Sequence, residues 1–304
     1  MSVDSTDWLP LEISTGPEPR VEWCHFGKRR FTEPFFEQSV SAALRDPFSL
    51  LFRRSTGIDE LTKSQSSRPS LEPRGFVFHM SRCGSTLVAQ MLAALPEHIV
   101  LSEPPPIDAI LRTREQGASE DQRIAWLCGW MRALGQPRNG ENALFVKFDA
   151  WHVFDLPLIR RAFPTTPWIF LHRDPIEVLV SALRGPGLQF VGRARDPSMS
   201  VVEARARVLA DIVAAAIEHL PLGGRAIDYS RLPDALFEEI ATSFSLDLDS
   251  ASTERMRAVT AFHAKSPSLF FGPDGHDKRS DASAEARAWC ERLLDPLHAR
   301  LLAV

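Results

Sequence analysis

The sequence predicts an α/β fold, with a central parallel sheet of about five strands flanked by helices. Five short runs are apolar over most of their length, which is typical of buried strands. They occupy residues 75–80, 98–103, 144–148, 168–172 and 225–229. Helical periodicity separates several of these runs. Because strands that are apolar on both faces and alternate with helices form parallel sheets covered on both sides, the alternation defines the fold class.

The helical segments show the three- and four-residue spacing of amphipathic helices. After the first strand the spacing runs through Leu87, Met91, Leu92 and Leu95. Before the last strand it runs through Val208, Ile212, Val213, Ala216, Ile217 and Leu220. From about residue 283 to 302 one stripe holds Trp289, Leu293, Leu297 and Leu301. Ligands of such folds bind at the carboxyl ends of the strands, so chemistry is expected just after residues 79, 102, 148 and 172.

Composition excludes several classes of protein. The chain has 304 residues with 44% hydrophobic and 24% charged residues, the profile of an ordinary globular protein. A formal net charge of −4 argues against a nucleic-acid partner, which requires a sustained basic surface. No apolar run approaches the ~18 residues that cross a membrane, and the N-terminus lacks the basic and apolar regions of a signal peptide. We therefore expect a cytoplasmic protein without a membrane partner.

The cysteines and the basic residues add two points. Cys24, Cys83, Cys128 and Cys290 form no CxxC pair, which favours free thiols and argues against a cysteine zinc site. The 35 basic residues are 30 arginines and five lysines. Since the planar fork of arginine matches phosphate and sulfate oxygens, the question is which arginines stand where an anion would be held.

The junction after the first strand has the properties of an anion-binding loop. HMSRCGSTLVAQML (79–92) reads as strand, tight loop and helix, and its loop residues are small or hydroxylated. The helix N-terminus would direct free N–H groups at an anion, and Arg82 would add a formal charge. The Walker pattern GxxxxGK with Ser or Thr is absent. The alternative is a plain strand-to-helix turn.

The junction after the fourth strand, in FLHRDPIEVLVSALR (170–184), predicts a second anion site. Asp174 is expected to cap the following helix, with Pro175 at its first position and Glu177 completing a capping box. Arg173 then stands beside a helix N-terminus, and Ser181 lies two turns along the same face as Asp174. The alternative for Arg173 is a surface salt bridge.

Together the two junctions resemble the nucleotide-binding signature of the sulfotransferases, enzymes that take sulfate from 3′-phosphoadenosine 5′-phosphosulfate (PAPS). The resemblance covers residues 74 to 303 and implies a P-loop NTPase-like fold. It implies a PAPS-binding domain over residues 74–304 and an N-terminal extension or lid over 1–73. Arginine at position 82, where cytosolic aryl and steroid enzymes usually have lysine, places the loop nearer the bacterial and Golgi-type branches.

The resemblance also assigns residues, position by position. It implies that Arg82, Cys83, Gly84, Ser85 and Thr86 form the loop around the 5′-phosphosulfate, with no chemistry at Cys83. It implies that Arg173 and Ser181 hold the 3′-phosphate. The C-terminal segment that closes over the cofactor looks like GPDGHDKRS (272–280), where Lys278 and Arg279 match. The expected product is 3′,5′-adenosine bisphosphate.

Catalysis would then fall to residues at the strand ends. Glu103 follows the second strand, as the catalytic glutamate does in protein-tyrosine sulfotransferases, and is the expected base; its alternative is a glutamate before a proline turn. Lys147 would neutralise charge on the bridging oxygen together with Arg82, or would be an ordinary ion-pair lysine. His152 is the second choice for the base, although a histidine there more often packs a loop.

Several questions stay open at the level of sequence. His79 and His172 flank the anion loops and are expected to hydrogen-bond locally, and no metal is implied. The aromatic segment 23–40 would cover the acceptor pocket, form a homodimer contact or extend the core, and the loop 184–198 reads as a gate or a solvated loop. The acceptor would be a small molecule, a glycan or a peptide with a hydroxyl or amine. The competing functions are a P-loop phosphotransferase and an inactive nucleotide-binding protein.

Overall fold

The computed structural model describes residues 7–14, 16–63, 69–185, 198–270 and 275–303. Most of the predicted gate loop 184–198 and residues 272–274 of the predicted closing segment 272–280 lie outside them. No helix in these ranges has the length and apolarity needed to cross a membrane.

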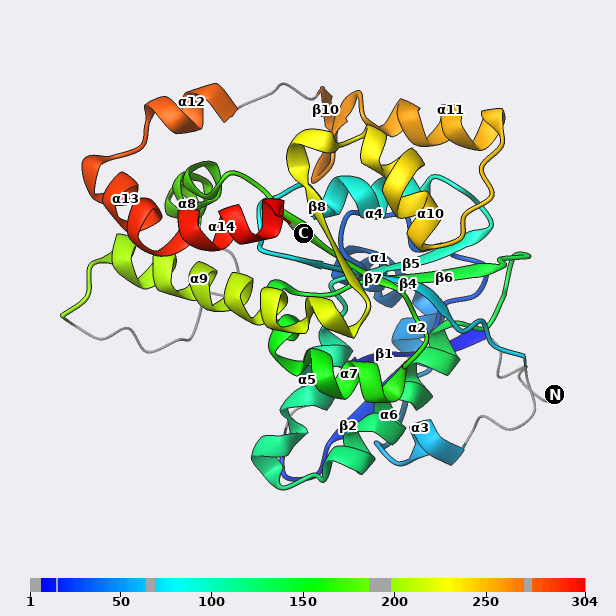
Figure 1. Cartoon of the computed structure of the whole chain (residues 1–304). Helices are drawn as coiled ribbons and strands as arrows, with labels where there is room; N and C mark the ends of the chain where they lie inside the picture. The colour runs from blue at the N-terminus through cyan, green and yellow to red at the C-terminus, as the bar shows by residue number, and fades with distance from the viewer. Residues whose placement is uncertain (1–6, 15, 64–68, 186–197, 271–274, 304) are drawn as a thin grey trace.

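A five-stranded parallel sheet forms the centre of the molecule (Figure 1), in the order β5-β6-β4-β7-β8. Its strands are β4 (Pro73–His79), β5 (His98–Ser102), β6 (Ala143–Lys147), β7 (Trp168–His172) and β8 (Gly224–Asp228). Every described residue of β5, β6 and β7 is buried, as the apolar runs predict. The predicted fold class is confirmed, with strand boundaries that differ by one or two residues at most positions.

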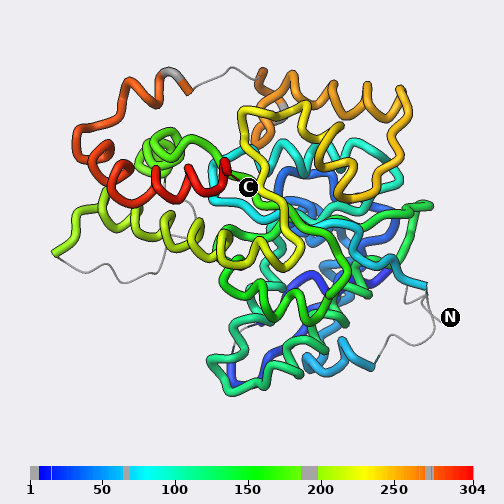
Figure 2. The backbone as a smooth tube through the Cα atoms, viewed as in Figure 1, coloured from blue at the N-terminus to red at the C-terminus, as the bar shows by residue number. Residues whose placement is uncertain are grey.

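Helices cover both faces of the sheet. They are α4 (Ser85–Ala93), α5 (Pro105–Arg112), α6 (Glu120–Leu134), α7 (Leu156–Ala162), α8 (Pro175–Arg184), α9 (Val201–His219), α10 (Ala241–Ser243), α11 (Ser250–Val259), α12 (Gly275–Ser280), α13 (Ala284–Trp289) and α14 (Asp295–Leu302). Figure 2 shows the long α9 running beside the C-terminal helices at one side of the sheet. Strands β4 and β7 are paired, so the β4–α4 and β7–α8 junctions lie next to each other.

The N-terminal extension contains a second sheet that the sequence did not predict. Strands β1 (Trp8–Ile13), β2 (Arg20–His25) and β3 (Arg54–Gly57) pair antiparallel, and α1 (Phe36–Leu44), α2 (Pro47–Leu51) and α3 (Glu60–Lys63) accompany them. The indole of Trp130 in α6 donates to the Pro10 carbonyl at 2.8 Å. Trp23, Phe26, Phe31 and Phe36 of the extension share one core with the body. The domain boundary at residue 73 stays a prediction.

The predicted C-terminal stripe packs against the core, but Trp289, Leu293 and Leu297 are only partly buried. A π-helical turn, Cys290–Leu294, separates α13 from α14. Each π-helical turn adds a residue relative to the α-helical repeat, which rotates the buried face. The deeply buried positions are consequently Ala286, Cys290, Leu294 and Leu301, of which the predicted stripe includes only the last.

Candidate active site

One cavity of about 910 Å³ opens at the carboxyl end of the central sheet, a volume typical of ligand pockets. Its wall includes most residues that the sequence singles out: Arg82, Cys83, Gly84, Ser85, Thr86, Glu103, Arg173, Ser181 and Lys278. Lys147 lies directly behind the wall, and Arg279 lies outside it. The two predicted anion junctions therefore face a single space.

The β4–α4 loop is tightly curled. Ser81, Arg82 and Gly84 have φ values of +75°, +54° and +83°, a backbone conformation that residues other than glycine seldom adopt. A Cβ on Gly84 would lie 2.6 Å from the Tyr229 ring, so glycine is required there for space as well as conformation. Strained backbone of this kind concentrates at ligand-binding sites, and curled loops at helix N-termini present N–H groups to anions.

Arg82 connects the two junctions. Its Nε donates to the Ser181 hydroxyl of α8 at 2.7 Å, although the residues are 99 positions apart. The neighbouring Cys83 is directed into the core instead, where its Sγ contacts the Leu171 carbonyl at 3.1 Å. Burial raises the pKa of Cys83 to about 12, so the thiol is inert and only the backbone of this residue is available to a ligand.

The β7–α8 junction confirms part of the predicted capping and corrects the rest. Asp174 Oδ1 accepts from the Ile176 N–H at 3.1 Å, and Pro175 occupies the first turn. The expected capping box at Glu177 is wrong, because this carboxylate turns to the side chain of Arg173, whose Nε donates to it at 2.6 Å. Buried charges require a partner, and this requirement outweighs a cap that Asp174 already provides.

Arg173 is a buried residue, not a surface salt-bridge residue. Only 7% of it is exposed. Besides Glu177, it stacks on Tyr229, with its guanidinium carbon 4.1 Å from the ring centroid. The ion pair and the stack together fix the guanidinium at the edge of the cavity.

The two basic residues of α12 have different places. Lys278 is buried and lines the cavity. Arg279 is more than half exposed and pairs with Asp174 at 3.3 Å and with Glu177 at 2.9 Å. Of the two matches in this segment, only Lys278 faces the candidate site.

Glu103 and Lys147 form a close pair beside the β4–α4 junction. Lys147 Nζ lies 2.5 Å from Glu103 Oε1 and 3.4 Å from Thr86 Oγ1. Glu103 has a φ of +51°, and its N–H donates to the Lys147 carbonyl at 2.7 Å. Burial opposes ionisation of Glu103, but the Lys147 ammonium and His79 outweigh it and hold the pKa of Glu103 well below its usual range.

His79 supports the same carboxylate. Its Nδ1 accepts the Ser81 N–H at 2.9 Å, so Nε2 is the nitrogen that carries the proton, and it lies 3.2 Å from Glu103 Oε1. Burial lowers the pKa of His79 and keeps the ring neutral. The predicted local hydrogen bond of His79 is confirmed, and it links the β4–α4 loop to Glu103.

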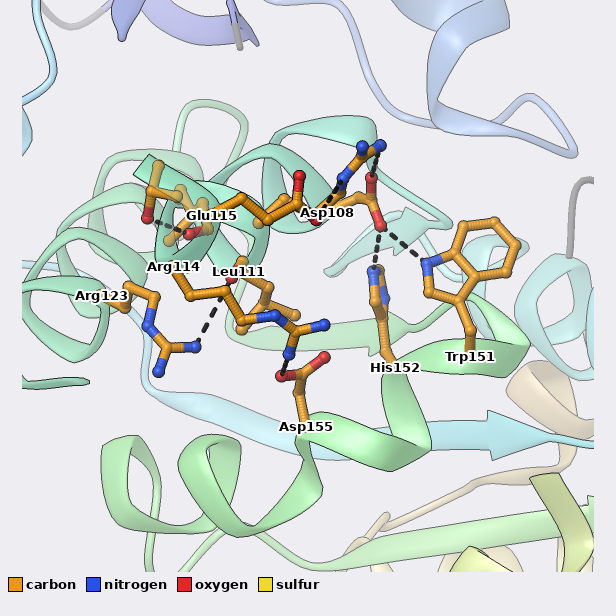
Figure 3. Close-up of polar contacts among 11 residues, drawn as sticks. Asp108, Leu111, Arg114, Glu115, Arg123, Trp151, His152 and Asp155 are labelled. Atoms are coloured by element: carbon orange, nitrogen blue, oxygen red, sulfur yellow. Dashed lines mark hydrogen bonds and ion pairs between the residues drawn. The ribbon is translucent and has the colours of Figure 1, made fainter. Parts of the chain in front are cut away.

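His152 is buried outside the lining of the cavity and contacts residues that do line it (Figure 3). Asp108 Oδ1 accepts from the Trp151 indole at 2.7 Å and lies 3.4 Å from His152 Nε2, while His152 Nδ1 accepts the Asp149 N–H at 3.3 Å. Both ring nitrogens are directed at these partners, and the ring is fully buried. The geometry gives His152 a packing and positioning role in the loop.

Asp149 and Lys265 are titratable wall residues that sequence reasoning missed. Asp149 follows β6, and burial raises the pKa of its carboxyl to about 7. Lys265 lies in the hairpin of β9 (Phe262–His263) and β10 (Ser266–Phe270); burial, then repulsion from Arg82 and Lys147, lowers its pKa to about 8. The scarcity of lysine was the one available signal for Lys265, and nothing in the sequence marked Asp149.

Comparison with known proteins gives similarity of fold. No protein-family model matches the sequence, and no curated protein matches it. The chain is similar to the sulfotransferase domain from the curacin biosynthetic pathway (16% identity, TM-score 0.48, 74% of this chain and 98% of that one). It is also similar to a sulfotransferase from Mycobacterium tuberculosis (14%, 0.46, 77% and 81%) and to a mouse sulfotransferase complexed with PAP (13%, 0.45, 81% and 93%). These values concern the fold alone.

Proposed function

We propose that this chain is a PAPS-dependent sulfotransferase that transfers a sulfuryl group to a hydroxyl or amine. The observation that carries the proposal is the pair of arginine-bearing strand-to-helix junctions, on adjacent strands, that face one cavity and are joined by the Arg82–Ser181 hydrogen bond. A 3′,5′-bisphosphate nucleotide requires two separate anion sites. A nucleoside triphosphate requires one cradle with the Walker lysine, which this loop lacks.

The residues present fit such a donor. Arg82, Ser85 and Thr86, with the N–H groups of the β4–α4 loop, would hold the 5′-phosphosulfate. Arg173, Ser181 and Lys278 would hold the 3′-phosphate. The pKa of Lys265 is lowered by burial and, after that, by the positive charges of Arg82 and Lys147, a repulsion that a bound anion would relieve. PAPS supplies the sulfuryl group, whose bond to the 5′-phosphate oxygen is broken in the transfer.

Glu103 is the proposed base, and Lys147 regulates it. Ionised Glu103 would accept the acceptor's proton, a role worth roughly 10²–10⁴ in rate. While Lys147 is paired with Glu103, the carboxylate is a weak base. Negative charge would grow on the leaving oxygen during transfer and attract Lys147 and Arg82. The Lys147–Glu103 ion pair would then weaken, and the basicity of Glu103 would rise. The same lysine would thereby couple leaving-group departure to proton transfer.

The acceptor would enter beside Glu103. Phe35 of the N-terminal extension, Trp151 and Phe262 line this cavity and provide apolar contact surface. A small molecule, a glycan or a peptide that presents a hydroxyl or amine would fit this description. The extension would thus contribute to acceptor binding through Phe35, while Trp23, Phe26, Phe31 and Phe36 lie in the core.

Nucleotide preference tests the proposal directly. Thermal unfolding is measured with 3′,5′-adenosine bisphosphate and, separately, with ATP and magnesium. At ~100 times its dissociation constant, the bisphosphate should add about 2.7 kcal/mol to the free energy of unfolding. Stabilisation by ATP and not by the bisphosphate would favour a phosphotransferase and overturn the proposal.

Replacement of the base tests the chemistry. Glu103→Gln should reduce the rate of transfer from labelled PAPS by roughly 10²–10⁴ while bisphosphate affinity is retained. Glu37→Gln is the matched control, because Glu37 lines the same cavity and is exposed. Equal turnover in the Glu103 variant and its control would remove Glu103 from this role. Binding without any turnover in the unmodified chain would identify an inactive nucleotide-binding protein.

A further inference from the structure

A cluster of two histidines and one carboxylate lies outside the cavity. His172 ends β7, Asp228 ends β8 and His298 belongs to α14. Asp228 Oδ2 is 3.5 Å from His172 Nδ1 and 3.5 Å from His298 Nε2. One ligand atom from each residue lies within 4.8 Å of the other two. Three separate elements thus bring metal-binding atoms to one point.

The two ring nitrogens that face Asp228 have unmet bonding capacity. His172 is 1% exposed, and neither its Nδ1 nor Nε2 of His298 has a hydrogen-bond partner in the described part of the chain. Buried polar atoms are nearly always satisfied, so this pair calls for a ligand. The local hydrogen bond expected for His172 is not made at this nitrogen.

The carboxylate is oriented toward the histidines by its own backbone. Asp228 Oδ1 accepts the Ser230 N–H at 2.7 Å, which leaves Oδ2 directed at the two rings. A fixed hydrogen bond of this type, behind a carboxylate ligand, is what positions metal-binding residues in known sites.

The two distances from the carboxylate match the edges of a tetrahedral zinc site. Zinc binds imidazole nitrogen and carboxylate oxygen at about 2.0–2.2 Å, so the edges of its tetrahedron measure about 3.3–3.6 Å. Both distances from Asp228 Oδ2 equal such an edge. Two imidazoles with one carboxylate favour zinc, whereas magnesium and calcium prefer all-oxygen sites.

We propose that His172, Asp228 and His298 bind one Zn²⁺ per chain, with the fourth position open to water. The ion would fasten α14 to the ends of β7 and β8, directly beside Arg173 in the sequence. The site escaped sequence analysis because its ligands are 56 and 70 residues apart, far from any spacing motif. The sequence implied no metal, so this proposal departs from that expectation; the three residues do not line the cavity of the candidate active site.

Metal content and stability test the site without any activity assay. The full chain, purified without a metal-chelating resin, is loaded with Zn²⁺, desalted and analysed by mass spectrometry for metal, where about one zinc per chain is expected. After chelation, Zn²⁺ at ~100 times its Kd should raise the Tm by roughly 5 °C, and Mg²⁺ should not. Co²⁺ in place of zinc should give the visible absorption of a tetrahedral site.

Two variants and a control make the test specific. His298→Gln and Asp228→Asn should lose the Zn²⁺-dependent shift, and the asparagine retains an oxygen for the Ser230 N–H. His219→Gln, a histidine at the end of α9, should keep the full shift. Absence of bound zinc, an equal shift in His298→Gln and His219→Gln, or a shift produced equally by Mg²⁺ would each overturn the proposal. Because the readouts are binding and Tm, these results are independent of whether the chain transfers sulfate.

Discussion

The two strand-to-helix junctions look alike in sequence, yet they present their arginines differently. Arg82 contacts a neutral hydroxyl, Ser181, and no carboxylate in the described residues pairs with it. Arg173 is paired with Glu177 and stacked on Tyr229. Both arginines line one cavity from adjacent strands.

Because of this difference, we expect the two junctions to have different functions. A cation without a carboxylate partner keeps its full charge for an incoming anion, whereas a paired cation mainly offers fixed hydrogen-bond donors. We therefore expect the β4–α4 loop to govern charge stabilisation during transfer. The β7–α8 junction should govern which nucleotide is chosen.

The largest expected effect is at Arg82. In Arg82→Met, transfer from PAPS should fall by roughly 10²–10³, the cost of removing one preorganised charge-stabilising donor. Arg184→Met, an exposed arginine at the end of α8 paired with Asp281, is the control. Steady-state transfer rates check this result. A loss of less than threefold at Arg82 would contradict the division of roles.

Arg173 should show a smaller and more selective effect. In Arg173→Met, affinity for 3′,5′-adenosine bisphosphate should fall by roughly 10–100-fold, since a charged hydrogen bond is worth about 1.5–3 kcal/mol. Binding of adenosine 5′-phosphate should change little, because it lacks the 3′-phosphate. Calorimetry with both nucleotides measures the difference.

A control is needed because Arg173→Met leaves Glu177 buried with Arg279 as its remaining described partner. The double variant Arg173→Met/Glu177→Gln removes that unbalanced charge. If either variant weakens both nucleotides equally, the 3′-phosphate is not held at this junction.

The sequence predicted the parts of the molecule that local pattern determines. The strand runs, both strand-to-helix junctions and the Asp174 cap all depend on residues within about ten positions of one another. Their apolar runs and capping residues are explicit in the sequence. The convergence of the two junctions on one cavity followed from the general behaviour of parallel sheets.

The parts it missed depend on contacts between distant segments. Glu177 was expected in a capping box, but Arg173 and Arg279 compete for its carboxylate. Strand β1 contains Pro10 and a register shift beside it, so no alternating pattern marked the N-terminal sheet. Lys265 acquires its place only because a short hairpin folds over the cavity.

Lys265 supplies the smallest expected effect and the sharpest comparison of the junctions. The pKa of Lys265 in the folded protein is lowered to about 8, so the unliganded protein loses the positive charge of Lys265 as the pH rises through 8. Binding of an anion would favour the protonated form of Lys265. Bisphosphate affinity should therefore decline above pH 8, by up to about tenfold per pH unit. Lys265→Met should abolish this decline.

The arginine variants then separate the junctions. Repulsion from Arg82 contributes to the low pKa of Lys265, so Arg82→Met should move the decline to higher pH. The charge of Arg173 is balanced by Glu177, so Arg173→Met should leave the pH of the decline unchanged. Calorimetric titrations between pH 6 and 10 with each variant provide the measurement. A shift of equal size in both variants would show that the two arginines present the same charge to the cavity, and the proposed difference between the junctions would be wrong.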